Sequence, residues 1–221
     1  MDTIRLLGLH LKLGILNEVQ YRANFWMQLL QSAIGLLTSL LGLGIVFSKT
    51  SSLAGWGPAE LLAVVGVYMV VGGFAQLVIQ PSLSRFMEDV RLGTLDFILT
   101  KPVDAQVLIS MRRIEIWKLI DIVLGAVVIG VAVSRLGARI GWSQAAAFVI
   151  VLVAGLVIVY SFLLFLATFS FWFVRLENVL NIFQSMYEAG RWPILIYPPW
   201  LRYALTFIVP IGFAITVPAA A

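Results

Sequence analysis

Long apolar runs separated by short polar segments dominate the chain. A helix needs about 20 consecutive apolar residues to cross the hydrocarbon core of a membrane. Four runs are long enough: Phe25–Phe47, Leu61–Ile79, Ile116–Val133 and Ala145–Val174. The last run is longer than a crossing requires, so we expect this helix to tilt or to protrude from the bilayer. The pattern predicts an all-α integral membrane protein, a polytopic helical bundle.

Two further apolar segments follow, and both are interrupted. Val179–Gly190 carries polar side chains, so it predicts a fifth span with a polar face. Leu201–Val217 is broken by Pro210 and preceded by Pro198–Pro199. Proline removes backbone donors, which a short intramembrane segment cannot easily replace. We therefore expect an outer re-entrant hairpin within residues 191–218.

The distribution of basic residues predicts the orientation, because Lys and Arg concentrate on the cytoplasmic side. A cytoplasmic N-terminus puts ten basic residues inside: Arg5, Lys12, Arg22, Arg85, Arg91, Lys101, Arg112, Arg113, Lys118 and Arg175. It leaves five outside: Lys49, Arg135, Arg139, Arg191 and Arg202. The bias favours an N-terminus in the cytoplasm.

Residues 1–22 predict an interfacial helix that stays on the protein. Basic residues interrupt the apolar run and no small-residue cleavage site follows, which argues against a signal peptide. Ile4, Leu7 and Leu11 share one helical face, as in a helix that lies on the membrane surface.

Composition supports a membrane protein with a single domain, residues 1–221. Apolar residues make up 61% of the chain and charged residues 12%, against about 25% charged in soluble domains. There is no cysteine and one histidine, His10, which excludes disulfides, a thiolate nucleophile and a Cys- or His-based metal site. The formal net charge of +4 is the excess of Lys and Arg that sets orientation in a membrane protein, so we expect no nucleic-acid partner.

The sequence offers little for enzymatic chemistry. The phosphate-binding pattern GxxxxGK[ST] does not occur, so we expect no ATPase activity and no cofactor in this chain. Paired acids deep in the apolar spans are also missing. We therefore assign no catalytic residue and no metal ligand.

One sizeable polar segment, residues 81–113, lies between the second and third spans. Ser82 or Ser84 can cap a short surface helix there, and Gly93 can end it. Leu83, Phe86, Met87 and Val90 recur at helical spacing and predict an apolar face that docks on a partner. The alternative interpretation is a solvated loop with an interfacial helix.

Charged and amide side chains in or near the spans leave two interpretations open. Asp121 follows Lys118 by three residues, which fits either a helical ion pair or a transport path. Glu188 precedes Arg191 by three residues, and that pair would brace an outer gate or simply satisfy two charges. Amides would hydrogen-bond between helices or line a polar strip; they are Gln28, Gln31, Gln76, Gln80, Asn181 and Gln184.

Two segments resemble a known family. The run EDVRLGTLDFILTKP, Glu88–Pro102, resembles the cytosolic segment after the second span of type-2 ATP-binding-cassette (ABC) exporter permeases. The run RWPILIYPPWLRYALTFIVPIGFAITVPA, Arg191–Ala219, resembles the outer re-entrant region of the same family. With the N-terminal elbow helix, the resemblance covers nearly the whole chain. The family has a sixth span after the re-entrant region, which this sequence does not contain.

The resemblance implies a role for each segment. The first contributes the coupling helix that sits in a cleft of an ATPase subunit, which would involve Arg85, Phe86, Glu88, Asp89, Arg91, Gly93, Thr94, Leu95, Asp96, Lys101 and Pro102. The second gates the exit, which would involve Glu188, Arg191, Trp192, Tyr197, Pro198, Trp200 and Arg202.

The resemblance also implies partners and a location. We expect two cytosolic ABC ATPase subunits, which hold ATP and Mg, a second permease that is homologous or identical, and membrane lipid. The protein would lie in the plasma or inner membrane. A lining rich in Phe, Leu and Trp favours an amphipathic or lipid-like substrate.

Two other function classes remain open from the sequence. An ion-gradient-driven secondary transporter or channel would need charged or broken helices at mid-membrane. A membrane anchor would bind a soluble partner through the polar segment without moving a substrate.

The predicted orientation can be tested because the chain lacks native cysteine. A cysteine at Ser51 (Ser51→Cys) should react with an impermeant maleimide on intact cells. A cysteine at Ser84 (Ser84→Cys) should react only after the cells are permeabilised. The opposite labelling pattern would invert the orientation.

Overall fold

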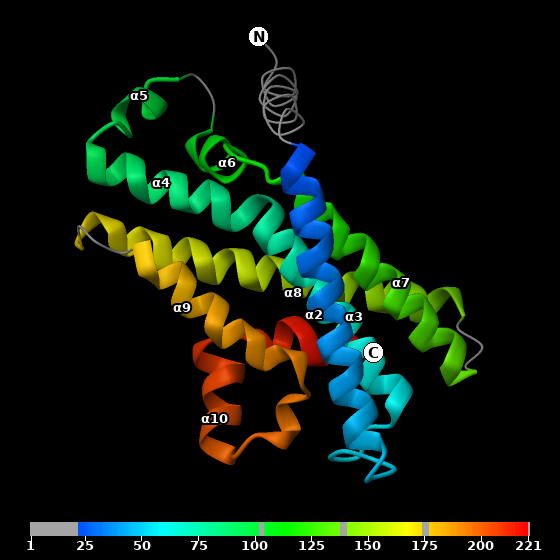
Figure 1. The fold of residues 1–221 in the computed structure, drawn as a ribbon. Coiled ribbons are helices and arrows are strands. Elements are labelled where there is room, and N and C mark those ends of the chain that lie inside the picture. Colours follow the sequence, from blue (N-terminus) through cyan, green and yellow to red (C-terminus); the bar gives the residue numbers. More distant parts are fainter. Residues whose placement is uncertain (1–21, 102–103, 138–140, 174–176, 221) are drawn as a thin grey trace.

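The computed structural model describes residues 22–101, 104–137, 141–173 and 177–220, and within these residues the regular elements are helices (Figure 1). The α-helices are α2 (Arg22–Phe47), α3 (Pro58–Phe74), α4 (Gln80–Leu92), α5 (Asp96–Leu99), α6 (Ala105–Ser110), α7 (Leu119–Leu136), α8 (Trp142–Thr168), α9 (Glu177–Tyr187), α10 (Pro199–Tyr203) and α11 (Val217–Ala220). The π-helices are η1 (Ala75–Ile79), η6 (Ala204–Ile208) and η7 (Gly212–Thr216). The 3-10 helices are η2 (Ile116–Lys118), η3 (Phe169–Phe171), η4 (Glu188–Arg191) and η5 (Ile194–Ile196).

Four helices are long and apolar enough to cross a membrane: Asn24–Phe47, Pro58–Leu92, Ile116–Leu136 and Trp142–Phe171. Each of them contains or largely overlaps one of the four runs identified in the sequence, and the all-α polytopic class is confirmed. The predicted interfacial helix over residues 1–22 lies almost entirely outside the described residues.

The predicted fifth span is shorter than a crossing. Its described part corresponds to α9 and η4, which together reach only about 25 Å at about 1.5 Å per residue in α9 and about 2.0 Å in η4. A bilayer core is about 30 Å thick. The C-terminal segments Pro199–Ile208 and Gly212–Ala220 meet at an angle of 82°, as a broken span or a re-entrant loop does. Pro210 lies in the break, where it cannot donate a backbone hydrogen bond.

The second span continues far beyond its apolar run. Helices α3, η1 and α4 form one helix of 35 residues from Pro58 to Leu92. The expectation that a cap at Ser82 or Ser84 starts a separate surface helix is therefore wrong. The predicted end of this helix at Gly93 is confirmed, because Gly93 adopts a left-handed conformation with φ of 69°.

The π-turn at η1 explains how this helix passes Pro81. Proline at position i has no N–H for the carbonyl at i−4, and its ring crowds that carbonyl. Here that carbonyl belongs to Leu77, and it accepts a hydrogen bond of 2.8 Å from the backbone N–H of Glu115 instead. A distant segment thus replaces the donor that Pro81 lacks.

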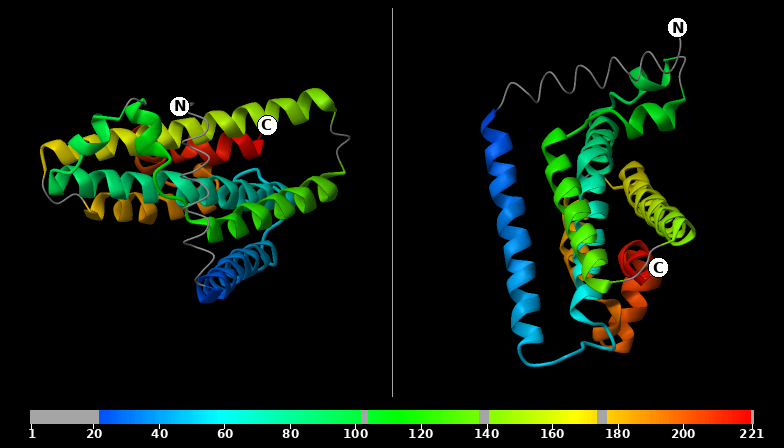
Figure 2. Two further views of the ribbon diagram at one scale, coloured as in Figure 1. Left: turned by 90° about the horizontal axis from the view of Figure 1, so that it is seen from above. Right: turned by 90° about the vertical axis from the view of Figure 1, so that its right-hand side faces the viewer.

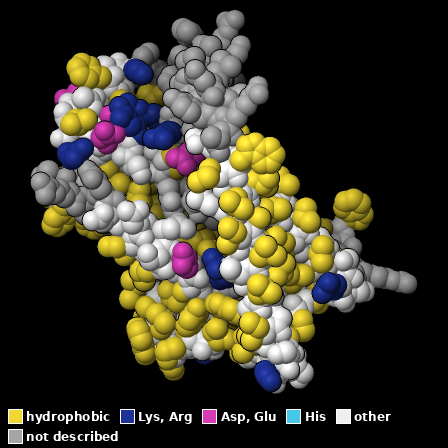
Figure 3. Space-filling model, viewed as in Figure 1, with side chains coloured by type: hydrophobic (Ala, Val, Ile, Leu, Met, Phe, Trp, Pro, Cys, Tyr) yellow, Lys and Arg dark blue, Asp and Glu magenta, His cyan; other side chains and the backbone are white. Residues whose placement is uncertain are grey.

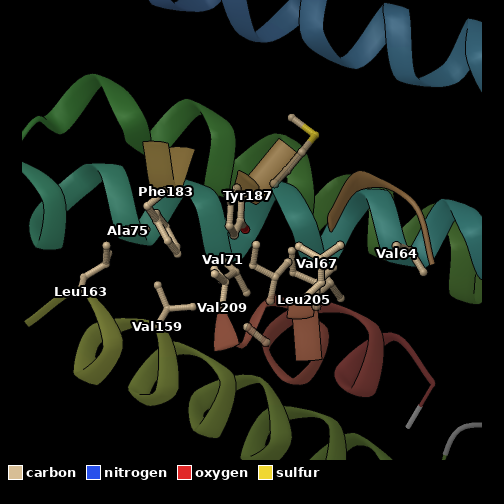
Figure 4. Packing of buried hydrophobic residues seen from close by; sticks show 14 of the residues in the cluster. Val64, Val67, Val71, Ala75, Val159, Leu163, Phe183, Tyr187, Leu205 and Val209 are labelled. Carbon is tan, nitrogen blue, oxygen red and sulfur yellow. The ribbon is translucent and has the colours of Figure 1, made fainter. Parts of the chain in front are cut away.

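Helix α3 forms the centre of the bundle. Of the most apolar stretch of its span 72% is buried, compared with 17% for each of the other three spans. Figure 4 shows Val64, Val67 and Val71 among residues from α8, α9 and the C-terminal hairpin. Apolar side chains occupy every face of α3, as expected for a helix surrounded by others.

Close packing of α3 against α7 depends on two glycines. A Cβ added at Gly125 would lie 2.8 Å from the carbonyl oxygen of Gly66, and one at Gly66 would lie 3.0 Å from that of Gly125. Nearer the C-terminal end of α3, Gly73 faces Ile122, which lies nearer the N-terminal end of α7. The two helices therefore run antiparallel. Small residues permit this approach, and close packing drives helix association in lipid.

The bundle has two ends (Figure 2). One end carries α5 and α6. The other carries the connection from α2 to α3, residues 48–57, together with η5 and α10. We call them the α5–α6 end and the α10 end.

The glycine contact yields a stability prediction. Gly125→Ala should lower the free energy of unfolding by about 1–3 kcal/mol, because the added methyl group overpacks the contact. Gly130→Ala, on the same helix, is the control, since nothing lies within 4 Å of a Cβ there. Thermal unfolding in detergent measures both variants, and equal melting temperatures would refute the role of the contact.

Candidate functional site

Charged side chains gather around α4, α5 and α6 (Figure 3). Asp89 organises this group, although its side chain is only 1% exposed. Its carboxylate accepts a hydrogen bond of 2.9 Å from Thr94 Oγ1 and forms an ion pair with Arg112. Arg85 Nε lies 3.9 Å from the same carboxylate. Asp89 therefore ties the end of α4 to the turn before α5 and to the segment after α6.

The backbone of Asp89 strengthens this tie. Its carbonyl accepts the N–H groups of Gly93 and Thr94, which closes the helix at the left-handed glycine. Burial, followed by the nearby Arg85, lowers the pKa of Arg112 from its ordinary value. Arg85 also pairs with Glu88, at 2.6 Å, beside the cluster.

Two further contacts fix the segment after α6 to the second span. Ser82 Oγ donates to the carbonyl of Arg113 at 2.9 Å and accepts its N–H at 3.2 Å. The backbone N–H of Glu115 donates to the carbonyl of Leu77, as described above. Together with Asp89, they connect the α5–α6 end rigidly to the helix that contains α3.

The predicted coupling residues that the structure describes fall into three groups by burial. Exposed ones are Arg85, Arg91, Gly93, Asp96 and Lys101; half-buried ones are Glu88, Thr94 and Leu95; Phe86 and Asp89 are buried, and Pro102 lies outside the described residues. The geometry does not test whether these residues contact an ATPase. The two buried ones, Phe86 and Asp89, make their contacts inside this chain.

The apolar face predicted to dock on a partner packs inside this chain instead. Leu83, Phe86 and Met87 are at most 6% exposed. Phe86 meets Phe171 of η3 edge to face, with ring centroids 5.9 Å apart. The prediction was wrong because α8 and η3 extend far enough to cover this face of α4.

Sequence analysis missed a different apolar surface at the same end. Leu92, Phe97 and Leu99 are exposed by 57%, 74% and 54%. They lie on and beside α5, next to exposed Asp96 and Lys101. The sequence contains a signal for this surface, because large apolar residues in a polar segment interrupted by glycine cannot be assigned to a membrane span. We call this group the α5 surface.

The predicted outer gate residues lie near the α10 end, in an arrangement held by backbone carbonyls. Tyr197 donates its hydroxyl to the carbonyl of Ala189 at 3.0 Å, and burial raises the pKa of Tyr197. Arg202 donates to the carbonyl of Leu195 at 2.7 Å. Pro198 and Trp200 are exposed. These contacts fold residues 189–202 into a compact unit.

Arg191 does not pair with Glu188 as expected, since no ion pair within 4 Å joins them. Its guanidinium lies over the Tyr68 ring, 5.3 Å from the centroid. Tyr68 in turn stacks on Tyr187. Trp192 packs on α2, with its ring 3.5 Å from where a Cβ of Gly42 would be.

Asp121 does not pair with Lys118 either. Its carboxylate accepts a hydrogen bond of 2.5 Å from Ser32 Oγ and one of 3.1 Å from Gln28 Nε2, both on α2. The helical ion pair expected from the spacing is absent from the described residues. The amides Gln80 and Gln184 do hydrogen-bond between helices, at 3.0 Å.

A cavity of about 180 Å³ lies beside these polar groups, between α2 and the elements α3, α7 and η4. Its lining residues are Gln28, Gln31, Ser32, Gly35, Leu36, Ser39, Tyr68, Met69, Gly72, Gly73, Gln76, Lys118, Asp121, Tyr187 and Arg191. We call it the polar chamber. Across the described residues no cluster of three or more His, Asp or Glu side chains could hold a metal ion.

The fold and this site define the class of protein: a multi-pass membrane domain of helices with one extended polar end. A comparison with protein families matches residues 33–221 to the ABC-2 family transporter proteins. The chain belongs to this family and is the membrane permease of an ABC transporter. Such permeases are membrane subunits that partner with ABC ATPases and are generally not catalytic. Searches of curated proteins and of solved structures returned no significant match.

The Asp89 cluster yields a prediction about local stability. Asp89→Asn should make amide hydrogens of residues 93–101 exchange about tenfold faster, because a charge-assisted hydrogen bond contributes about 1.5 kcal/mol. Asp96→Asn, an exposed aspartate in the same segment, is the control. Hydrogen exchange with mass spectrometry measures both, and unchanged exchange in Asp89→Asn would contradict the tie.

Proposed function

We propose that this chain is the permease of an ATP-driven exporter in the cell membrane, with its N-terminus and its α5–α6 end in the cytoplasm. It pairs with a second permease, homologous or identical, and with two ABC ATPases that bind ATP and Mg. Its substrate is an amphipathic or lipid-like molecule that leaves the cytoplasm. Family membership supports the pairing with ATPases, and the excess of basic residues at the α5–α6 end supports the orientation.

The observation that carries this proposal is the α5 surface. Phe97 is 74% exposed, yet it belongs to a segment fixed at both sides by Asp89 and by the contacts of Ser82 and Glu115. A large aromatic side chain held rigidly in water is typical of the centre of a protein interface. The ATPase is the partner that family membership implies.

The same contacts give a route for motion. When ATP binding closes the ATPases, the α5 surface is displaced, and the rigid connection carries the displacement into the helix Pro58–Leu92. Because α3 is the central helix and packs on α7, a shift of α3 moves the spans that line the polar chamber. The bent pair Pro199–Ile208 and Gly212–Ala220 would gate the exit at the outer side.

A second candidate, an ion-gradient-driven transporter or channel, draws on the polar chamber. Asp121 and Arg191 line a cavity among apolar spans, which ion-coupled sites require. The exposed α5 surface has no role in that mechanism. Copurification of an ATPase would support the exporter, and its absence would favour the ion-gradient-driven transporter or channel.

The coupling surface can be tested by affinity purification from native membranes in mild detergent. An ABC ATPase should copurify with the wild type, and Phe97→Asp should reduce its yield at least tenfold, since truncating a central aromatic anchor costs about 2 kcal/mol or more. Asp96→Lys should lower ATPase activity linked to transport while insertion into the membrane is unchanged.

Leu136→Asp is the matched control. Leu136 is also an exposed apolar residue, but it lies at the C-terminal end of α7, away from the α5 surface. Its ATPase yield should equal that of the wild type. If no ATPase copurifies with the wild type in several mild detergents, the exporter proposal fails and the second candidate or an anchoring role takes its place.

A further inference from the structure

The polar chamber follows one face of α2. Its lining residues on this helix recur every three or four positions, from Gln28 through Ser32 and Gly35 to Ser39. Over these residues the stripe extends about 16 Å along the helix axis. The opposite surface of α2 exposes large apolar side chains such as Leu30, as a lipid-facing helix does.

A second cavity, of about 250 Å³, adjoins the chamber and leads to the α5–α6 end. It shares Gln28, Gln31 and Lys118 with the chamber and is also lined by Arg113 and Glu115. At the other end, Trp192 packs on α2 at Gly42, about one helical turn beyond Ser39. The chamber is therefore approached from the α5–α6 end, and an aromatic ring lies at its far end.

The charges of the chamber are unbalanced. Asp121 is satisfied by Ser32 and Gln28, so its carboxylate does not need a cation. In the part of the chain that the structure describes, no carboxylate lies within 4 Å of the charged groups of Lys118 or Arg191. Arg191 Nε is buried and has no hydrogen-bond partner there.

Two cations that line one cavity and have no ion pair favour an anion. Charge-assisted hydrogen bonds from Arg or Lys to phosphate or carboxylate are about twice as strong as neutral ones. A cavity of about 180 Å³ is smaller than the pockets of about 300–1,000 Å³ that hold whole drug-sized ligands. It has room for a head group, while an apolar tail would extend out of the cavity into neighbouring lipid.

We propose that the polar chamber binds the anionic head group, phosphate or carboxylate, of an amphipathic molecule through Lys118 and Arg191. The inference builds on the proposed function in that it names the chemical class of the exported substrate. Gln28, Gln31 and Ser32 add neutral hydrogen-bonding groups along the approach.

The test uses the intact protein in nanodiscs of phosphatidylcholine, without an ATPase. Gln31→Cys gives a single reporter in both cavities, because the chain has no other cysteine. Dodecyl phosphate should slow maleimide alkylation of this cysteine at least tenfold. Dodecyltrimethylammonium, with the same tail and a cationic head, and inorganic phosphate should leave the rate unchanged.

Variants of the two cations make the test specific. Lys118→Gln and Arg191→Gln should each raise the dodecyl phosphate concentration needed for protection about tenfold, the effect of one charged hydrogen bond. Arg191→Lys keeps the charge and should restore most of the protection. Lys49→Gln removes an exposed cation at the α10 end and should match the parent protein.

Three outcomes would overturn the proposal. Equal protection by dodecyltrimethylammonium would mean that the chamber selects the tail and not the anion. Equal protection by inorganic phosphate would mean that it binds a free anion. Unchanged protection in Lys118→Gln and Arg191→Gln would place the amphiphile elsewhere. Since no ATPase is present, failure of the exporter proposal in the purification experiment would not alter these results.

Discussion

Gly66 and Gly125 bring the backbones of α3 and α7 into direct contact, and the other helices pack around α3. In lipid, helices gain little from burying apolar surface, so close packing between small residues determines which helices associate. Helix α3 consequently has neighbours on nearly every side, whereas α2, α7 and α8 keep a broad lipid-facing surface. Any displacement of α3 changes contacts throughout the bundle.

The helix containing α3 also links the membrane to the polar end. Pro81 would normally end or kink a helix. Here the π-turn η1 and the donor from Glu115 let the helix continue to Leu92, where Gly93 and Asp89 redirect the chain toward α5. A single rigid element thus extends from the central packing contact to the surface proposed to meet the ATPase.

The polar side chains within the bundle are satisfied by partners distant in sequence. Spacing alone predicts ion pairs of Lys118 with Asp121 and of Glu188 with Arg191, since residues three apart on a helix are neighbours. In the folded chain Asp121 binds Ser32 and Gln28 on α2, and Arg191 lies over Tyr68. Both cations remain available to the polar chamber.

The sequence by itself determined the all-α class, the four spans and the bent C-terminal pair, because these depend on runs of apolar residues and on prolines that interrupt them. The resemblance around Glu88–Pro102 also led to the correct family. Only the tertiary structure decided which face of each helix is covered. Phe86 is buried because α8 and η3 pack against α4, whereas Phe97 on α5 is exposed.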